Sequence, residues 1–293
     1  MMRAMLWASV VAAGAAAAYL VVGYVVALRL SAPTHQPVER TPASVGLDYR
    51  EVGFRSSDGL ALRAWWIGKT GSSRTVLLVH GFTGDKSDPH VVETARVYHR
   101  AGFDVLMLDL RANGESEGER VTLGYREVRD VRAALSWLER HGFEPSKVVL
   151  HGWSMGGATV VRAAPGSGVA AVVEEAAYAD LPPLLWEQLP EASGLPTFFN
   201  PGVFLMGRVF LEIDPWAVRP KEDARRLSEE GVPFMIIHSR DDEVIPFEHA
   251  ESFAAAYPGA VFWELKGYEH VAAYTHPEYG KRLLSFLDGA GVD

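Results

Sequence analysis

The chain has 293 residues, of which 48% are hydrophobic and 22% charged, a composition that is typical of globular proteins and excludes intrinsic disorder. The net charge is −9, and no run of Lys and Arg supplies the clustered positive charge that a nucleic-acid partner requires. The absence of cysteine excludes disulfides, thiolate catalysis, Cys-ligated zinc and iron–sulfur clusters.

The N-terminus, residues 1–30, is expected to form a transmembrane anchor. The run Ala4–Leu28 lies between two arginines and carries no charge. At about 1.5 Å per residue it is long enough to cross a hydrocarbon core of about 30 Å. A cleaved signal peptide is the alternative, but the apolar region of such a peptide is usually only about 7–15 residues long. We therefore expect an uncleaved helix, in which Gly14 would let another helix approach closely.

Residues 31–44 are rich in proline and poor in apolar residues, and we expect them to form a linker. A globular domain is expected over residues 45–293. Its first two strands form a pair, 49–54 and 60–67, joined by the turn Ser57-Asp58-Gly59. Short, continuous apolar runs predict further strands that are buried on both faces of a parallel sheet: 75–79, 105–108, 147–150, 169–173, 233–237 and 261–265.

Helical patterns separate these strands, at 91–101, 125–141, 156–164, 221–229, 248–257 and 277–287. Alternating strands and helices predict an α/β fold in which helices flank a mostly parallel central sheet. Residues 178–216 break the alternation, because the segment is too long for an ordinary loop and too apolar for a linker. We expect this segment to form a small helical cap.

A candidate nucleophile lies in the motif Gly152-Trp153-Ser154-Met155-Gly156, between a predicted strand and a predicted helix. In a G-x-S-x-G motif the glycines permit a sharp strand-to-helix turn that lifts the serine hydroxyl out of the sheet. An ordinary turn is the alternative reading of so short a motif. The strand before it and the small-residue helix after it favour Ser154 as a nucleophile.

Serine is a weak nucleophile at neutral pH, so it needs a base and a group that orients the base. In this architecture the two partners follow in the order acid, then histidine. His270 lies in a loop between the last predicted strand and the final helix, where a base can reach the C-terminal edge of the sheet, and His276 is its main rival. The acid should follow the preceding strand, where the sequence offers three carboxylates: Asp241, Asp242 and Glu243.

An oxyanion requires two backbone N–H donors, one directly after the nucleophile and one from the loop after an earlier strand. Met155 is the first by position, and Phe82 of the segment His80-Gly81-Phe82-Thr83-Gly84 is the second. No H-E-x-x-H motif or glycine-rich phosphate-binding pattern is present, so we expect neither a metal nor a cofactor.

Over about residues 45–290 the sequence resembles the α/β-hydrolase superfamily. Five segments carry the resemblance: His80–Gly84, Asp109–Ser116, Gly152–Gly156, His238–Pro246 and Glu269-His270. Within the superfamily the chain looks most like bacterial membrane-anchored or cell-surface hydrolases, described as serine aminopeptidase- or esterase-like. The resemblance implies an α/β-hydrolase fold, a Ser-Asp-His triad, no cofactor and hydrolysis of an acyl bond. It also implies that the acid is Asp242.

Two turns depart from the family's pattern. The segment Asp109–Ser116 usually reads Asp-x-Arg-Gly-His-Gly-x-Ser, whereas this chain has Ala112-Asn113 at its centre. The strand before the acid usually ends in His-Gly, whereas this chain has His238-Ser239. Asp109 and Arg111 are expected to hold loops through ion pairs rather than to bind substrate.

The sequence therefore predicts a serine hydrolase that cleaves small-molecule carboxylic esters through an acyl-enzyme on Ser154, Asp242 and His270. Two alternatives remain open: a peptidase or amidase that uses the same triad, and a non-catalytic binding module tethered to the membrane. The resemblance to surface hydrolases and the short N-terminal flank favour a catalytic domain outside the cytoplasm.

Overall fold

The computed structural model describes residues 1–292 except 37 and 39, and it divides into two compact units. The first unit combines Met1–Ala32 with Leu181–Val218. The second combines Pro33–Asp180 with Arg219–Asp293 and contains the sheet.

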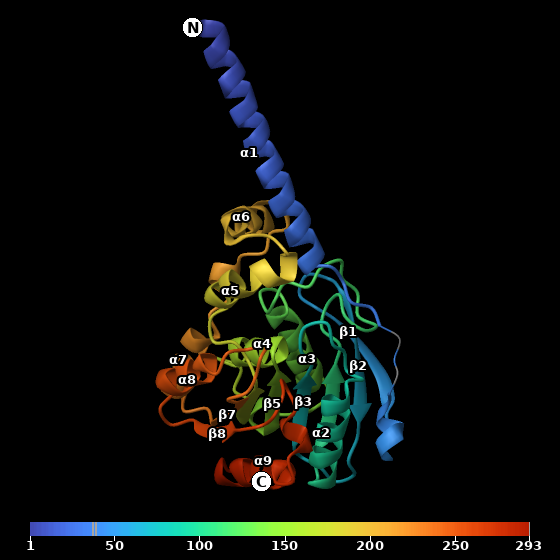
Figure 1. Cartoon of the computed structure of the whole chain (residues 1–293). Helices are drawn as coiled ribbons and strands as arrows, with labels where there is room; N and C mark the ends of the chain where they lie inside the picture. Colours follow the sequence, from blue (N-terminus) through green and yellow to red (C-terminus); the bar gives the residue numbers. More distant parts are fainter. Residues whose placement is uncertain (37, 39, 293) are drawn as a thin grey trace. The chain divides into compact units, whose positions relative to one another are not determined.

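An eight-stranded sheet forms the centre of the second unit, with strand order β1-β2-β4-β3-β5-β6-β7-β8 (Figure 1). The first two strands run antiparallel to each other, and β2 runs antiparallel to β4; all other neighbours are parallel. The strands span Arg50–Arg55 (β1), Ala61–Ile67 (β2), Thr75–Val79 (β3), Asp104–Leu108 (β4), Val148–Trp153 (β5), Ala171–Glu175 (β6), Phe234–Ser239 (β7) and Val261–Leu265 (β8). The mostly parallel sheet expected from the alternating pattern is confirmed.

Burial along the strands follows their place in the sheet. Strands β3 to β7 are buried at every residue, as continuous apolar runs predict. Strand β8 was expected to be buried on both faces, and this prediction is wrong. It is an edge strand, so Val261 and Phe262 are exposed while Trp263 and Leu265 are buried.

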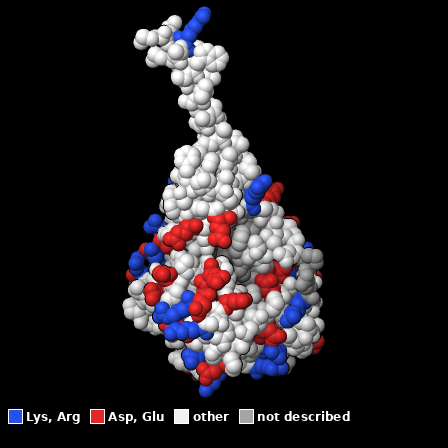
Figure 2. Space-filling model, viewed as in Figure 1, with Lys and Arg blue, Asp and Glu red and all other residues white. Residues whose placement is uncertain are grey.

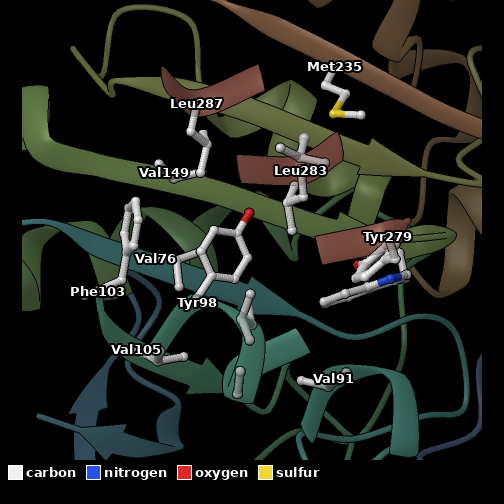
Figure 3. Packing of buried hydrophobic residues seen from close by; sticks show 14 of the residues in the cluster. Val76, Val91, Tyr98, Phe103, Val105, Val149, Met235, Tyr279, Leu283 and Leu287 are labelled. Atoms are coloured by element: carbon white, nitrogen blue, oxygen red, sulfur yellow. The ribbon is translucent and has the colours of Figure 1, made fainter. Parts of the chain in front are cut away.

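Helices cover both faces of the sheet. They span Pro89–Arg100 (α2), Val128–Arg140 (α3), Met155–Ala163 (α4), Pro220–Glu230 (α7), Glu248–Ala256 (α8) and Tyr279–Gly289 (α9). Figure 3 shows Tyr98 of α2 and Leu283 of α9 packed with Val76 and Val149 of the sheet. On the other face, Trp66 of β2 packs against Trp137 of α3, and α4, α7 and α8 follow in turn.

The first unit contains the long helix Met2–Leu30 (α1) together with Leu181–Ser193 (α5) and Asn200–Phe210 (α6). Helix α1 is long and apolar enough to cross a membrane. Helix α6 packs against the C-terminal part of α1. This contact is made at Gly23, where an added Cβ would lie 2.6 Å from the Gly202 carbonyl carbon. An added Cβ at Gly14 would meet nothing within 4 Å, so the approach of another helix at Gly14 stays a prediction.

The segment expected to be a linker is partly held by the second unit. Thr34 donates its N–H to Ala112 O over 2.7 Å and accepts the Gly114 N–H over 3.2 Å. His35 Nδ1 lies 2.9 Å from the Gly114 carbonyl oxygen. Residues 37 and 39 of this segment lie outside the described residues. Thr34 and His35 are therefore bound at the turn where Ala112-Asn113 replaces the family's usual residues.

Candidate active site

Ser154 lies on a sharp turn between β5 and α4. Its backbone has a φ of +52° and a ψ of −119°, a conformation that residues other than glycine rarely adopt. A Cβ at Gly156 would collide with the carbonyl oxygens of Val79 and His80, and one at Gly152 would collide with Gly156 itself. The flanking glycines are therefore required by close backbone approach, as the motif predicts.

The loop after β3 passes directly beside this turn. A Cβ at Gly81 would lie 3.2 Å from Ser154 Cβ. The Phe82 N–H has no acceptor among the described residues. Met155 is the first residue of α4, where backbone N–H groups have no partner within the helix. The two predicted oxyanion donors are thus unengaged N–H groups near the serine.

His80 holds the loop after β3 in place from within the protein. The ring is buried, with Nδ1 2.8 Å from Gly81 O, and Nε2 accepts the Leu110 N–H over 3.0 Å. Backbone groups of both loops thus hold the ring through its two nitrogens. His80 is therefore a structural histidine that joins the loops after β3 and β4.

Asp242 and His270 lie side by side after β7 and β8. His270 Nδ1 is 2.8 Å from Asp242 Oδ2. The other oxygen, Oδ1, accepts the Val244 and Ile245 N–H groups over 2.8 and 2.9 Å. Burial raises the pKa of Asp242, but the bond from His270 and these N–H groups outweigh it and hold the pKa below its usual value. The carboxylate therefore stays ionised and fixes the ring.

The neighbouring candidates occupy other positions. Asp241 is exposed, and its Oδ2 accepts the Gly267 N–H over 2.6 Å. Glu243 is exposed. The rival histidine, His276, accepts the Glu278 N–H at Nδ1 over 3.0 Å, directly before α9. Only Asp242 of the three carboxylates touches His270 in the described structure.

The three predicted residues Ser154, Asp242 and His270 follow β5, β7 and β8 at the same end of parallel strands. The carboxyl ends of such strands meet at one edge of a sheet. No hydrogen bond joins Ser154 Oγ to another side chain within the part of the chain that the structure describes. Such bonds are often long in ligand-free sites and tighten when substrate binds.

Glu175, at the end of β6, is a residue of this site that the sequence reasoning missed. Its Oε2 accepts the Trp153 indole N–H and its Oε1 accepts the Ala273 N–H, both over 3.0 Å. Its carbonyl oxygen accepts the Ser154 N–H over 2.8 Å. Glu175 therefore joins the serine turn to the segment that follows His270. Burial raises its pKa to about 7 despite the two N–H donors.

A signal for Glu175 was present in the sequence. Two acids, Glu174 and Glu175, directly follow a buried apolar run. The predicted strand ended at residue 173 because buried acids are rare. The observed strand includes both. Glu174 is also buried, and burial raises its pKa well above the usual value.

Asp109 and Arg111 form buried ion pairs, as expected. Asp109 pairs with Lys86, and its oxygens also accept the backbone N–H groups of Lys86 and Glu115. Arg111 lies between Asp58 and Asp130, with nitrogen-to-oxygen distances of 2.8 and 2.6 Å. These ion pairs hold the loop after β4. They also neutralise the charges of Asp109 and Arg111, so neither charge is free to bind a substrate.

Within the described residues, no three His, Asp or Glu side chains gather in a way that could hold a metal ion. A groove of about 710 Å³ lies at the opposite ends of β7 and β8, beside α9. Phe234, Trp263 and Arg282 are among its lining residues. It contains none of the candidate catalytic residues.

The sequence and the fold both match known proteins. A model of the alpha/beta hydrolase family matches residues 76–279. The alpha/beta hydrolase domain-containing protein WAV2 of Arabidopsis thaliana is 28% identical over 261 residues, which cover 85% of this chain and 81% of that protein. The lysophosphatidylserine lipase ABHD12 of Macaca fascicularis is 25% identical over 274 residues, which cover 86% of this chain and 65% of that protein.

Among solved structures, the esterase Pf2001 of Pyrococcus furiosus superposes with a TM-score of 0.71 and 23% identity. The match covers 88% of this chain and 98% of the esterase. At this level of identity the likeness is one of fold.

Proposed function

The chain belongs to the alpha/beta hydrolase family, and on this premise we propose that it is a serine hydrolase that cleaves carboxylic esters of small molecules. Ser154 is the nucleophile, His270 the base and Asp242 the group that orients the base. The esterase among its structural neighbours and the lipase among its relatives support an ester as the bond that is cleaved.

The observation that carries the proposal is the pairing of a strained serine with an oriented histidine at one edge of the sheet. Ser154 is held at a positive φ on the turn after β5, and the Nδ1 of His270 is bonded to Asp242 over 2.8 Å. Strain at a single non-glycine residue persists where the surrounding structure enforces it. Here Gly152 and Gly156 enforce it by close backbone contact.

Acylation follows from this geometry. Ser154 Oγ attacks the ester carbonyl carbon while its proton passes to His270 Nε2. The carbonyl oxygen becomes an oxyanion, which accepts the N–H groups of Phe82 and Met155. When the intermediate collapses, the ester C–O bond breaks and His270 returns the proton to the leaving alkoxide, which departs as an alcohol. The acyl group remains on Ser154 as an ester.

Deacylation repeats the sequence with water. The water oxygen attacks the acyl carbon while His270 Nε2 takes a proton from the water. The bond between the acyl carbon and Ser154 Oγ then breaks. The proton passes from His270 to Ser154, and a carboxylic acid leaves. Asp242 remains ionised throughout and stabilises the imidazolium.

A fluorophosphonate probe combined with a substrate panel tests the proposal. The purified full chain is expected to be labelled at Ser154 and to hydrolyse p-nitrophenyl esters faster than aminoacyl amides of the same acyl group. Faster amide cleavage would favour a peptidase or amidase on the same triad. An absence of labelling and of turnover would favour a non-catalytic binding protein.

We also infer that α1 anchors the chain in a membrane by a single crossing, with the catalytic unit outside the cytoplasm. The helix spans 29 residues, longer than the about 20 residues that a bilayer requires, and a window of 18 residues within it has a mean hydropathy of 2.1. Residues 2–18 of this helix are all exposed. A free apolar helix surface of this kind is stable in lipid and unfavourable in water.

A further inference from the structure

We propose that the cap helix α6 is a second membrane contact of this protein, seated in the layer between lipid headgroups and acyl chains beside the anchor α1. The partner is the lipid bilayer itself. The proposal rests on the inferred membrane crossing by α1 and is independent of the chemistry that the catalytic unit performs.

The first observation is that α6 is bound to α1 by polar and aromatic contacts. Tyr19 of α1 donates its hydroxyl to Phe198 O over 2.9 Å and accepts the Gly202 N–H over 3.0 Å. Its ring stacks on Phe199 at 5.4 Å between centroids. Five residues along α1, the Tyr24 ring meets Phe210 at 5.8 Å. These contacts lie at both ends of α6, so the helix is fixed along α1 rather than touching it at one point.

The second observation is how closely the two helices approach. A Cβ at Gly23 would lie 2.6 Å from the Gly202 carbonyl carbon, and one at Gly202 would lie 2.7 Å from the Tyr19 ring. Real Cβ atoms do not approach backbone or ring atoms this closely, so both positions require glycine. Val26 and Ala27 of α1 are buried in the same small core as Val203 and Phe204. The pairing of α1 with α6 is a packed interface.

The position of this interface along α1 sets its depth. A helix crosses the hydrocarbon core in about 20 residues. Counted from Arg3, the charged residue before the apolar run, such a crossing ends near Gly23. Tyr19 and Tyr24 bracket this point, and tyrosine is enriched at membrane–water interfaces. Helix α6 is therefore bound where α1 leaves the hydrocarbon core.

The surface that α6 and the segments before it leave exposed suits this depth. Leu205, Val209 and Phe210 are 49%, 57% and 62% exposed. Phe198 and Trp186 add two exposed rings from the segments before α6. The sequence from 192 to 207 contains no charged residue, and Arg208 is the single charge within α6. Between Arg3 and Arg29, α1 likewise carries no charge, and Figure 2 shows an uncharged surface along the stalk below its basic N-terminal tip.

The exposed apolar surface of α6 continues that of α1, and this continuity identifies lipid as its occupant. The exposed apolar side chains of α6 lie beside the helix that we infer crosses the bilayer, at the level where that helix emerges. Aromatic and aliphatic groups at this level are transferred favourably into the headgroup–acyl boundary. Arg208, the one charged residue of α6, is paired with Asp214 at 3.4 Å between Nε and Oδ2.

The absence of cysteine makes the depth of single positions measurable, because one introduced cysteine can be labelled selectively. We choose three exposed valines: Val209 of α6, Val11 of α1 and Val261 of the edge strand β8. Each full-length variant, Val209→Cys, Val11→Cys or Val261→Cys, carries a nitrobenzoxadiazole label in phosphatidylcholine–phosphatidylglycerol vesicles. Quenching is measured with aqueous iodide and with lipids that carry a doxyl group near the headgroup or near the chain end.

The expected result is a graded depth. The Val11 label is quenched most by the deep doxyl lipid, the Val209 label most by the shallow one, and the Val261 label by iodide alone. Iodide should quench Val209 several-fold less than Val261. A Val209 label as open to iodide as Val261 overturns the proposal.

Two other outcomes also overturn it. A Val209 label shielded from both iodide and doxyl lipids would mean that a protein surface, such as a second copy of the chain, covers α6. A Val11 label quenched by iodide would remove the membrane crossing and the α6 contact together. Neither readout uses ester hydrolysis, so failure of the proposed hydrolase activity leaves this test intact.

Discussion

The Nδ1 of His270 lies 2.8 Å from Asp242 Oδ2, across 28 residues of sequence that include α8 and β8. This bond keeps a proton on Nδ1, so Nε2 carries the lone pair that a base requires. Both backbone N–H bonds to the other carboxylate oxygen keep the acid from rotating away. The pair is therefore prepared before any substrate binds.

Replacing Asp242 tests this pair directly. Asp242→Asn keeps the shape of the side chain but favours the wrong tautomer of His270, and we expect the rate of p-nitrophenyl ester hydrolysis to fall by about 10⁴. Asp241→Asn is the matched control, since an Asn oxygen can still accept the Gly267 N–H, and its rate should stay near wild type. The reverse pattern would contradict the assignment.

Replacing Ser154 separates catalysis from strain. Ser154→Ala and Ser154→Gly should both lose ester hydrolysis by several orders of magnitude, because no nucleophile remains. Glycine relieves the positive φ whereas alanine retains it, so Ser154→Gly should be more stable than Ser154→Ala by about 1 kcal/mol. Chemical denaturation in detergent measures the difference. Most of the activity surviving in either variant would exclude Ser154 as the nucleophile.

Glu175 should make stability depend on pH. Burial raises the pKa of Glu175 from 4.5 to about 7. Between these two pH values the folded chain keeps a proton on Glu175 that the unfolded chain has released. The free energy of unfolding is therefore highest below pH 4.5, as far as Glu175 is concerned, and it falls by up to about 3 kcal/mol as the pH rises through about 7.

The variant Glu175→Gln cannot titrate and isolates this effect. The free energy of unfolding of wild type minus that of the variant should fall as pH rises from 5 to 8. Gln also accepts only one of the two N–H groups well, so some rate is expected to be lost at every pH. A stability difference that is constant with pH would show that Glu175 does not change protonation in this range.

The buried pair Lys86–Asp109 should matter far more than an exposed one. Lys86→Met leaves the buried Asp109 carboxylate without its cation, and we expect a loss of about 3–5 kcal/mol in the free energy of unfolding. Arg225→Met, which breaks an exposed pair with Glu222, is the control and should cost at most about 1 kcal/mol. Equal losses in the two variants would mean that burial of the pair is not decisive.

The proposed topology is tested on intact cells. A protease added outside should remove the catalytic unit of the full chain, because that unit lies beyond the membrane from the short N-terminal flank. Lysed cells provide the control for protease sensitivity. A catalytic unit that is protected in intact cells but cleaved after lysis would place it in the cytoplasm.

Much of the second unit could be predicted from local patterns. The strands at 75–79 and 261–265 were predicted at their observed ends, and the ends of the others within three residues, because apolar periodicity is a property of neighbouring residues. Burial could not be predicted in the same way. The exposure of Val261 and Phe262 follows from the place of β8 at the edge of the sheet, which no local pattern contains.

The candidate site divides along the same line. The glycines around Ser154 and the chain order of acid and histidine are local signals that select Ser154 and His270 for testing. They leave three carboxylates open, and the choice of Asp242 rests on the resemblance to the family. The role of Glu175 was missed, because its partners Trp153 and Ala273 lie 22 and 98 residues away. The contact of α1 with α6 at Gly23 was not predicted, because it joins segments far apart in the chain.

The sequence by itself determined the family, the mostly parallel sheet and the turn that carries Ser154, because backbone geometry at glycines and the alternation of strand and helix act over a few residues. Only the tertiary structure decided which buried charges meet, as in Lys86 with Asp109, and which apolar helix surfaces are covered, as in α1 with α6. Such contacts depend on the spatial order of strands and on packing between segments far apart in the chain. A pattern read along the chain holds no record of either.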